Sequence, residues 1–203
     1  MLATGARWTG HTTPYAATTV EVAREGRTGI LAGMDITEVI LHQHGEQRRM
    51  FSMLEEWPRD DNDGLKALWK RLEILLEVHA EAEERFFYPE LVKLGKGAGD
   101  ADSVEEEVED AIKDHNEIRG AIRAVRRHEP GSTQWWTAVW EARKANDDHM
   151  AEEEREDLLD FRHHADLQTR HEIAVQFLTF EARHYEGVPI RDKDPEAYVR
   201  QFG

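Results

Sequence analysis

Histidine and glutamate recur in this chain in two copies of one pattern. Each copy contains a single histidine and, about 35 residues later, a second histidine with a glutamate four positions beyond it. In an α-helix, residues four apart lie on the same face, so each His-x-x-x-Glu pair points in one direction. Imidazole and carboxylate are ligands of iron, zinc, copper and manganese. The six predicted metal ligands, in two copies about 70 residues apart, are His44, His79 and Glu83, then His115, His149 and Glu153.

The doubled pattern fits a pair of metal ions. A carboxylate has two oxygens, so each glutamate is able to bridge two ions about 3.5–4 Å apart. Each ion would receive two histidines and share both glutamates and a solvent oxygen, which leaves an open position for a reacting molecule. A single His-x-x-x-Glu pair arises readily by chance in an acidic helical protein, whereas a repeat of the whole pattern does not. Without metal, six ionisable groups would be buried at high cost.

Hydrophobic periodicity predicts five helices and no β-strand. Asp35 and Ser103, each followed three residues later by glutamate, form capping boxes that start the first and third helices. Pro89 is expected to bend or end the second helix, and the tail over residues 191–203 shows no strong pattern. The predicted helices span about residues 35–57, 65–94, 103–129, 132–160 and 166–185.

Four long helices with short connections predict an all-α fold, an up-down-up-down four-helix bundle with an additional C-terminal helix. The expected domains are an N-terminal extension (1–33), a di-metal four-helix bundle (34–162), and the C-terminal helix and tail (163–203). The single histidines lie on the first and third helices, and the His-x-x-x-Glu pairs lie on the second and fourth. Apolar neighbours direct the single histidines inward, so all six ligands are expected to meet at mid-bundle.

Composition excludes several classes of partner and chemistry. The formal net charge of −16 argues against nucleic acid and anionic membranes, and no apolar run is long enough to span a membrane. The sequence has no cysteine, which excludes disulfides, thiolate ligands and a cysteine nucleophile. With no secretory signal, a cytoplasmic protein is expected. The expected partner is a small diatomic molecule or peroxide, and the sequence leaves open whether the chain forms a homodimer.

The order of the six residues resembles that of the hemerythrin-like HHE cation-binding domain family. Residues 76–79, 83–84 and 88–89 are similar to the family's second helix, and Asp114-His115 is similar to its third-helix motif. The resemblance covers about residues 35–160. It implies a four-helix bundle that holds two iron ions in a non-haem centre, oxo- or hydroxo-bridged and also bridged by the two glutamates. Members of the family carry dioxygen, sense oxygen or iron, or react with peroxide or nitric oxide.

Two departures from the family's oxygen carriers bear on the activity. The carriers have another histidine one turn after the lone histidine of the third helix, and here that position is Arg119. They also use an aspartate five positions after the fourth-helix histidine, where this chain has Glu153 four positions after His149. With two histidines on each iron, we expect a di-iron oxidoreductase that decomposes hydrogen peroxide like a catalase or peroxidase. The alternatives are non-enzymatic dioxygen, nitric oxide or iron binding or sensing, and a structural zinc site.

Four further residues occupy equivalent places in the two halves and are predicted to orient the ligands. An arginine lies four positions after each single histidine, and a glutamate directly follows each ligand glutamate. We expect each arginine to pair with a carboxylate beside the site; the alternative is a solvated ion pair at the bundle rim. The four residues are Arg48, Arg119, Glu84 and Glu154. The histidines of the last predicted helix are not expected to reach the metals, Tyr88 is expected to fill the core, and no catalytic residue is predicted.

Overall fold

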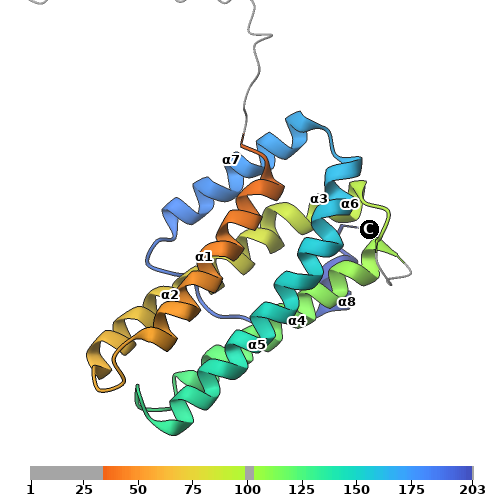
Figure 1. Ribbon diagram of the computed structural model, residues 1–203. Coiled ribbons are helices and arrows are strands. Elements are labelled where there is room, and N and C mark those ends of the chain that lie inside the picture. Colours follow the sequence, from red (N-terminus) through yellow and green to blue (C-terminus); the bar gives the residue numbers. More distant parts are fainter. Residues whose placement is uncertain (1–33, 99–102, 203) are drawn as a thin grey trace, which may run out of the picture. The chain divides into compact units, whose positions relative to one another are not determined.

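The computed structural model describes residues 34–98 and 103–202 (Figure 1). These residues form helices and include no β-strand, which confirms the predicted all-α fold. The predicted N-terminal extension, residues 1–33, lies outside the described part of the chain. In chain order the helices are α1 (Ile36–Glu56), α2 (Asn62–Ala82), the π-helix η1 (Glu83–Phe87), α3 (Tyr88–Leu94), α4 (Val104–Val125), α5 (Thr133–Arg155), α6 (Asp157–His164), α7 (Leu167–Arg183) and α8 (Pro195–Val199).

The predicted helix starts at Asp35 and Ser103 are confirmed. The Asp35 carboxylate accepts a hydrogen bond from the Thr37 amide at 3.0 Å, and the Ser103 hydroxyl accepts one from the Glu106 amide at 3.2 Å. Each bond satisfies an amide that the first turn of a helix leaves unpaired. The Glu38 carboxylate instead accepts from Arg162 at 3.4 Å, so half of the predicted capping box at Asp35 has another partner.

The second predicted helix begins three residues early and contains a π turn. Its backbone continues to Leu94, although Pro89 was expected to bend or end it. A proline ring clashes with the carbonyl four residues earlier in a regular α-helix. The wider turn of η1, in which the Tyr88 amide donates to the Glu83 carbonyl, comes directly before Pro89 and relieves that clash. The π turn therefore begins at a predicted metal ligand.

Two predictions for the C-terminal half were wrong. The fourth predicted helix does not run unbroken to residue 160, because the backbone at Glu156 (φ −118°, ψ −76°) separates α5 from α6. The tail, for which no element was expected, forms α8. Asp194 caps this helix by accepting from the Ala197 amide at 2.7 Å, and Tyr198 and Val199 bury their side chains. The tail is thus a packed part of the fold.

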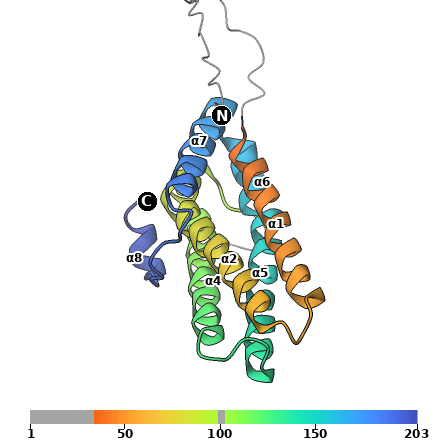
Figure 2. The ribbon, with the colours of Figure 1, turned by 90° about the vertical axis from the view of Figure 1, so that its left-hand side faces the viewer.

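The four long helices α1, α2, α4 and α5 lie side by side (Figures 1 and 2). Helix α1 packs on α2 and α4 packs on α5, while α1 also contacts α5 and α2 contacts α4. Helix α7 packs against α1, α2 and η1, and α8 packs against α4. The result is a helical bundle with two further helices against its sides. Within the described residues, none of the helices has the length and apolarity needed to cross a membrane.

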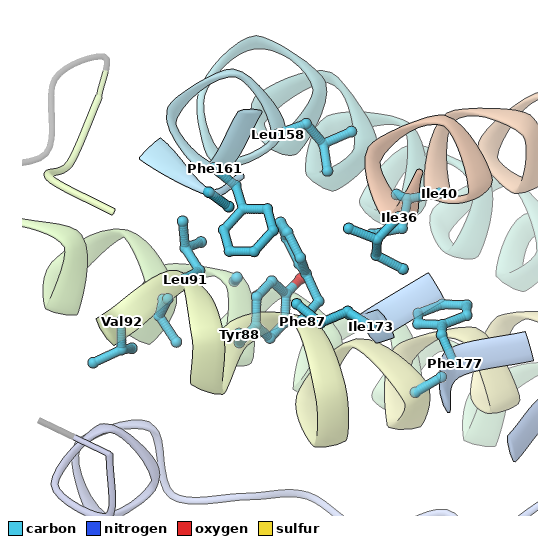
Figure 3. Close-up of a cluster of buried hydrophobic side chains, with 14 of the residues drawn as sticks. Ile36, Ile40, Phe87, Tyr88, Leu91, Val92, Leu158, Phe161, Ile173 and Phe177 are labelled. Carbon is cyan, nitrogen blue, oxygen red and sulfur yellow. The ribbon is translucent and has the colours of Figure 1, made fainter. Parts of the chain in front are cut away.

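Two apolar clusters fill the interior. One joins the start of α1 to η1, α3, α6 and α7 and includes Ile40, Phe87 and Phe177 (Figure 3). The other joins the end of α1 to α2, α4 and α5 and includes Leu54 and Trp135. On α1 and α4, the predicted ligand histidine lies in the chain between members of one cluster and members of the other. The predicted site therefore lies between two dry layers.

Candidate metal centre

The structure brings the predicted ligands into two overlapping groups. In the first, one ligand atom each from His44, His79 and Glu83 lies within 4.8 Å of the others. In the second, the same holds for Glu83, His115 and His149. All of these side chains are buried, with at most 4% of their surface exposed. Glu83 belongs to both groups, so two ion positions that share this carboxylate are available.

The two glutamates are placed differently. Glu83 directs Oε1 to His79 Nε2 at 2.8 Å and Oε2 to His115 Nε2 at 3.3 Å, one oxygen to each group. Glu153 directs Oε2 to His44 Nε2 at 3.2 Å, and its other oxygen accepts a hydrogen bond from the Tyr88 hydroxyl at 3.1 Å. Glu83 is thus placed so that one oxygen could serve each of two ions. The bridging roles of Glu83 and Glu153 both stay predictions.

The atoms that face the centre have the chemistry of an ion site. His44 Nε2, His79 Nε2, both Glu83 oxygens and Glu153 Oε2 are buried and make no hydrogen bond of normal geometry, and their contacts are with one another or with His115 Nε2. Such buried polar atoms need a proton or a cation between them. His115 Nε2 and His149 Nε2 face each other at 3.1 Å, so one must carry a proton or both must face a cation. Two metal ions would satisfy all of these atoms at once.

The outer nitrogen of each histidine is held by an oxygen of a neighbouring side chain. An oxygen at Nδ1 favours the tautomer that is protonated there, which leaves the Nε2 lone pair directed inward. The Nδ1 contacts are His44 with Glu154 (2.9 Å), His79 with Gln43 (2.7 Å), His115 with Glu84 (2.7 Å) and His149 with Asp114 (3.5 Å). The rings are therefore oriented as metal ligands before any ion binds.

The predicted arginine–glutamate pairs form, but the two are unequal. Arg48 donates to Glu154 at 2.7 Å, and both side chains are partly exposed, at 40% and 27%. Arg119 donates to Glu84 at 2.8 Å, and this pair is buried, at 2% and 0%. Lys193 from the tail also contacts Glu84. The first pair thus lies near the rim, as the alternative interpretation had it, and the second belongs to the interior.

Sequence reasoning missed several contacts to the site. Tyr88 fills the core as expected, but its hydroxyl also binds Glu153. Helix α7 covers the His79 side with Phe177, whose ring centroid is 5.9 Å from that of His79, and with Glu181, which accepts from Gln43 at 2.6 Å. A tyrosine five residues after Glu83 faces the centre only because of the π turn, and no local pattern marks that turn.

In the metal-free protein, protons on histidine take the place of ions. Burial opposes the protonation of His44, but Glu153 and Glu154 outweigh it and raise the pKa of His44 to about 9. In the same way Glu83 and Glu84 overcome burial and raise the pKa of His115 to about 9. Both rings are therefore charged at neutral pH and balance the buried carboxylates.

Metal loading at pH 7 is expected to release about two protons, because a histidine must be neutral to bind a metal. A pH indicator in weakly buffered solution measures the release, which should fall towards zero above pH 9. In the metal-free protein, protonated His44 and His115 add to the free energy of unfolding. This contribution is complete below pH 6.5, the ordinary pKa of histidine, and disappears as the pH rises through about 9. Loading at pH 7 without proton release would contradict the charge balance described above.

Replacing Tyr88 by phenylalanine is expected to weaken metal binding about 10–100-fold without preventing it, the usual effect of losing a side chain that orients a ligand. The change removes the hydroxyl that holds Glu153 and leaves the buried ring in place. Competition with a chelator measures the affinity. Tyr185→Phe is the matched control, since Tyr185 is 74% exposed. Equal affinities for the two variants would show that the Tyr88 hydroxyl does not position Glu153.

One of three comparisons with known proteins found a match. A search of curated proteins and a search of solved structures each found no significant match. The family model of the hemerythrin HHE cation binding domain matches residues 35–159, which is more than half of the chain and includes all six predicted ligands. The match extends from the cap of α1 into α6. The chain therefore belongs to the hemerythrin HHE cation-binding domain family.

Proposed function

We propose that this protein holds two iron ions in an up-down-up-down bundle and decomposes hydrogen peroxide. One observation carries the proposal: two buried pairs of histidines, His44 with His79 and His115 with His149, each form a possible ligand group with the same carboxylate, Glu83. A mixed imidazole and carboxylate donor set suits iron. Two bound iron ions would supply the reversible redox change that peroxide disproportionation requires.

Arg119 supports peroxide chemistry over oxygen carriage. It occupies the position at which the family's carriers have an additional histidine ligand, and its guanidinium donates to Glu84 at 2.8 Å. A guanidinium has no lone pair available for a metal and stays charged. Each half of the centre therefore has two histidines, which leaves room for a reacting molecule on both sides.

The surrounding residues would control protons and water. Burial and the charge of Glu153 raise the pKa of Tyr88 well above its ordinary value, so its hydroxyl stays protonated and donates to Glu153 Oε1. The apolar clusters on either side of the site exclude bulk water. A dry site strengthens the electrostatic interactions of the buried charges and limits side reactions.

The test is dioxygen evolution from hydrogen peroxide by iron-loaded protein. We expect half as much dioxygen as peroxide consumed, at a rate above that of the same concentration of free iron. His79→Ala, which removes a ligand, is expected to lose the activity. The control is His42→Ala, since His42 is an exposed histidine that is not a predicted ligand. Turnover no faster than that of free iron would end the peroxide proposal.

A second candidate is a dioxygen, nitric oxide or iron sensor. The observation that favours it is the contact of C-terminal elements with the side chains that orient the ligands. Lys193 contacts Glu84, and Glu181 of α7 accepts from Gln43, which in turn contacts His79. A change at the centre would thereby reach α7 and the tail. A reversible change of the absorption spectrum on adding and removing the gas, without peroxide turnover, would favour this candidate.

A further inference from the structure

A small acidic recess opens beside the centre, between α4 on one side and α5 and α6 on the other. Its volume is about 10 Å³, which is room for a single water-sized species. Two predicted ligands, His149 and Glu153, form its inner wall. The other lining residues are Glu107, Ala111, Asp114, Glu152 and Asp157. The recess therefore presents several carboxylates beside two of the predicted ligands.

Glu107 is buried in this recess without a donor for its charge. Only 6% of its surface is exposed, and neither carboxylate oxygen has a hydrogen-bond partner. The Ala98 amide lies near enough to lower the pKa of Glu107, but it is outside hydrogen-bond geometry. Asp157 is buried against Glu107, at 3% exposure. An unpaired buried carboxylate is costly, so this pair needs a proton or a cation between its members.

The surrounding charges increase that need. Besides each other, the charged groups that act most strongly on Glu107 and Asp157 are all acidic: Asp160, Glu156, Glu153 and Glu152. Burial raises the pKa of Glu107 to about 7 and that of Asp157 well above its ordinary value. A shared proton is thus one way to neutralise the pair. Carboxylate oxygens from two facing elements are also the ligands that hard divalent cations prefer.

We propose that Glu107 and Asp157 form a divalent-cation site in this recess, through which metal ions reach His149 and Glu153. The inference rests on the proposed metal centre and adds a route into it. The two carboxylates lie on α4 and at the start of α6, so they hold a cation between two elements that both border the centre. Asp114 and Glu152 line the same recess and attract cations toward it.

The first experiment counts bound ions. Manganese(II) is added to the metal-free protein, and the free ion is measured by its electron paramagnetic resonance signal. We expect two ions in the centre and a third, weaker one in the recess. Glu107→Gln and Asp157→Asn should each lose the third ion. Glu117→Gln, an exposed position on the same helix, removes the same charge and should keep it. A wild-type protein that binds no third ion would overturn the proposal.

The second experiment measures loading. Cobalt(II) absorption follows occupancy of the centre after rapid mixing. We expect Glu107→Gln and Asp157→Asn to load about tenfold more slowly or worse, yet to reach the final spectrum of the wild-type protein, while Glu117→Gln loads at the wild-type rate. Variants as fast as wild type would favour the shared proton and overturn the proposal. Equal slowing in Glu117→Gln would also overturn the proposal, because the loading rate would then depend on the net charge of the protein and not on a site in the recess.

The two proposals fail in different ways. Cobalt(II) and manganese(II) report occupancy without any peroxide chemistry, so a protein without peroxide turnover still decides whether the recess binds and delivers ions. Conversely, loss of the loading effect leaves the peroxide test of the fully loaded protein unchanged.

Discussion

Replacing Glu83 by alanine is expected to remove both metal ions from the protein. Glu83 is fully buried and is the residue shared by the two ligand groups, with one oxygen toward His79 and the other toward His115. Burial opposes its ionisation, but the two histidines outweigh this and hold its pKa well below the ordinary value. The carboxylate is therefore charged at neutral pH and contributes to both ion positions. Loss of any one of the four histidines leaves one group intact, whereas loss of Glu83 leaves neither.

Metal analysis after loading and gel filtration measures this effect. We expect two ions per chain for the wild type and fewer than about 0.2 for Glu83→Ala, because a lost ligand typically costs several kcal/mol of binding free energy. Glu73→Ala is the matched control. Glu73 is a buried glutamate on α2, the helix that continues into η1. It pairs with Arg126 at 2.9 Å and with Lys70 at 2.7 Å, and not with the predicted ligands. This variant should keep both ions. One ion retained by Glu83→Ala would show that the two positions do not depend on a shared carboxylate.

Helical geometry explains why five of the six predicted ligands come together in the two groups, whereas Glu153 lies beside His44 without belonging to either group. A His-x-x-x-Glu spacing puts both side chains on one face, and a repeated helix pair places the two copies opposite each other. The same reasoning found Arg48 with Glu154 and Arg119 with Glu84. It did not find that one pair is buried, because burial depends on the tail, whose five-residue helix is too short for a periodic pattern.

Contacts that depend on irregular backbone were not predictable. The π turn changes which residue after Glu83 faces the centre, and it brings Tyr88 to Glu153. The break at Glu156 starts a new helix at Asp157, which turns this carboxylate toward Glu107. Neither the Tyr88–Glu153 contact nor the Asp157–Glu107 contact follows from a constant helical period of 3.6 residues. Each depends on a point where the regular α-helix is interrupted.

Replacing Glu84 by alanine is expected to destabilise the metal-free protein far more than the equivalent change at Glu154. Without Glu84, the buried Arg119 loses its 2.8 Å ion pair and keeps only longer contacts with Asn116 (3.4 Å) and Glu77 (3.6 Å). Removing one member of a buried ion pair costs about 3–5 kcal/mol. Without Glu154, the partly exposed Arg48 is free to turn to water, and the loss is about 1 kcal/mol. Urea unfolding of the two variants in the presence of a chelator measures both values.

The pKa shifts alone do not distinguish these two glutamates. Hydrogen bonds from His44 and Arg48 lower the pKa of Glu154 to about 2, and His115, Arg119 and Lys193 overcome burial to lower that of Glu84 to about 2. Both ionised carboxylates therefore stabilise the fold above pH 4.5, the ordinary pKa of glutamate. This contribution disappears as the pH falls toward 2. A pKa compares two protonation states of one group, whereas truncation also removes the closest contact of the partner arginine. Of the two arginines, Arg48 is able to turn to water and Arg119 is buried. If Glu84→Ala does not fold, Glu84→Gln and Glu154→Gln carry the same comparison, since each keeps an acceptor but loses the charge. Equal losses of stability in the matched pairs would show that burial of the Glu84 pair does not matter to the fold.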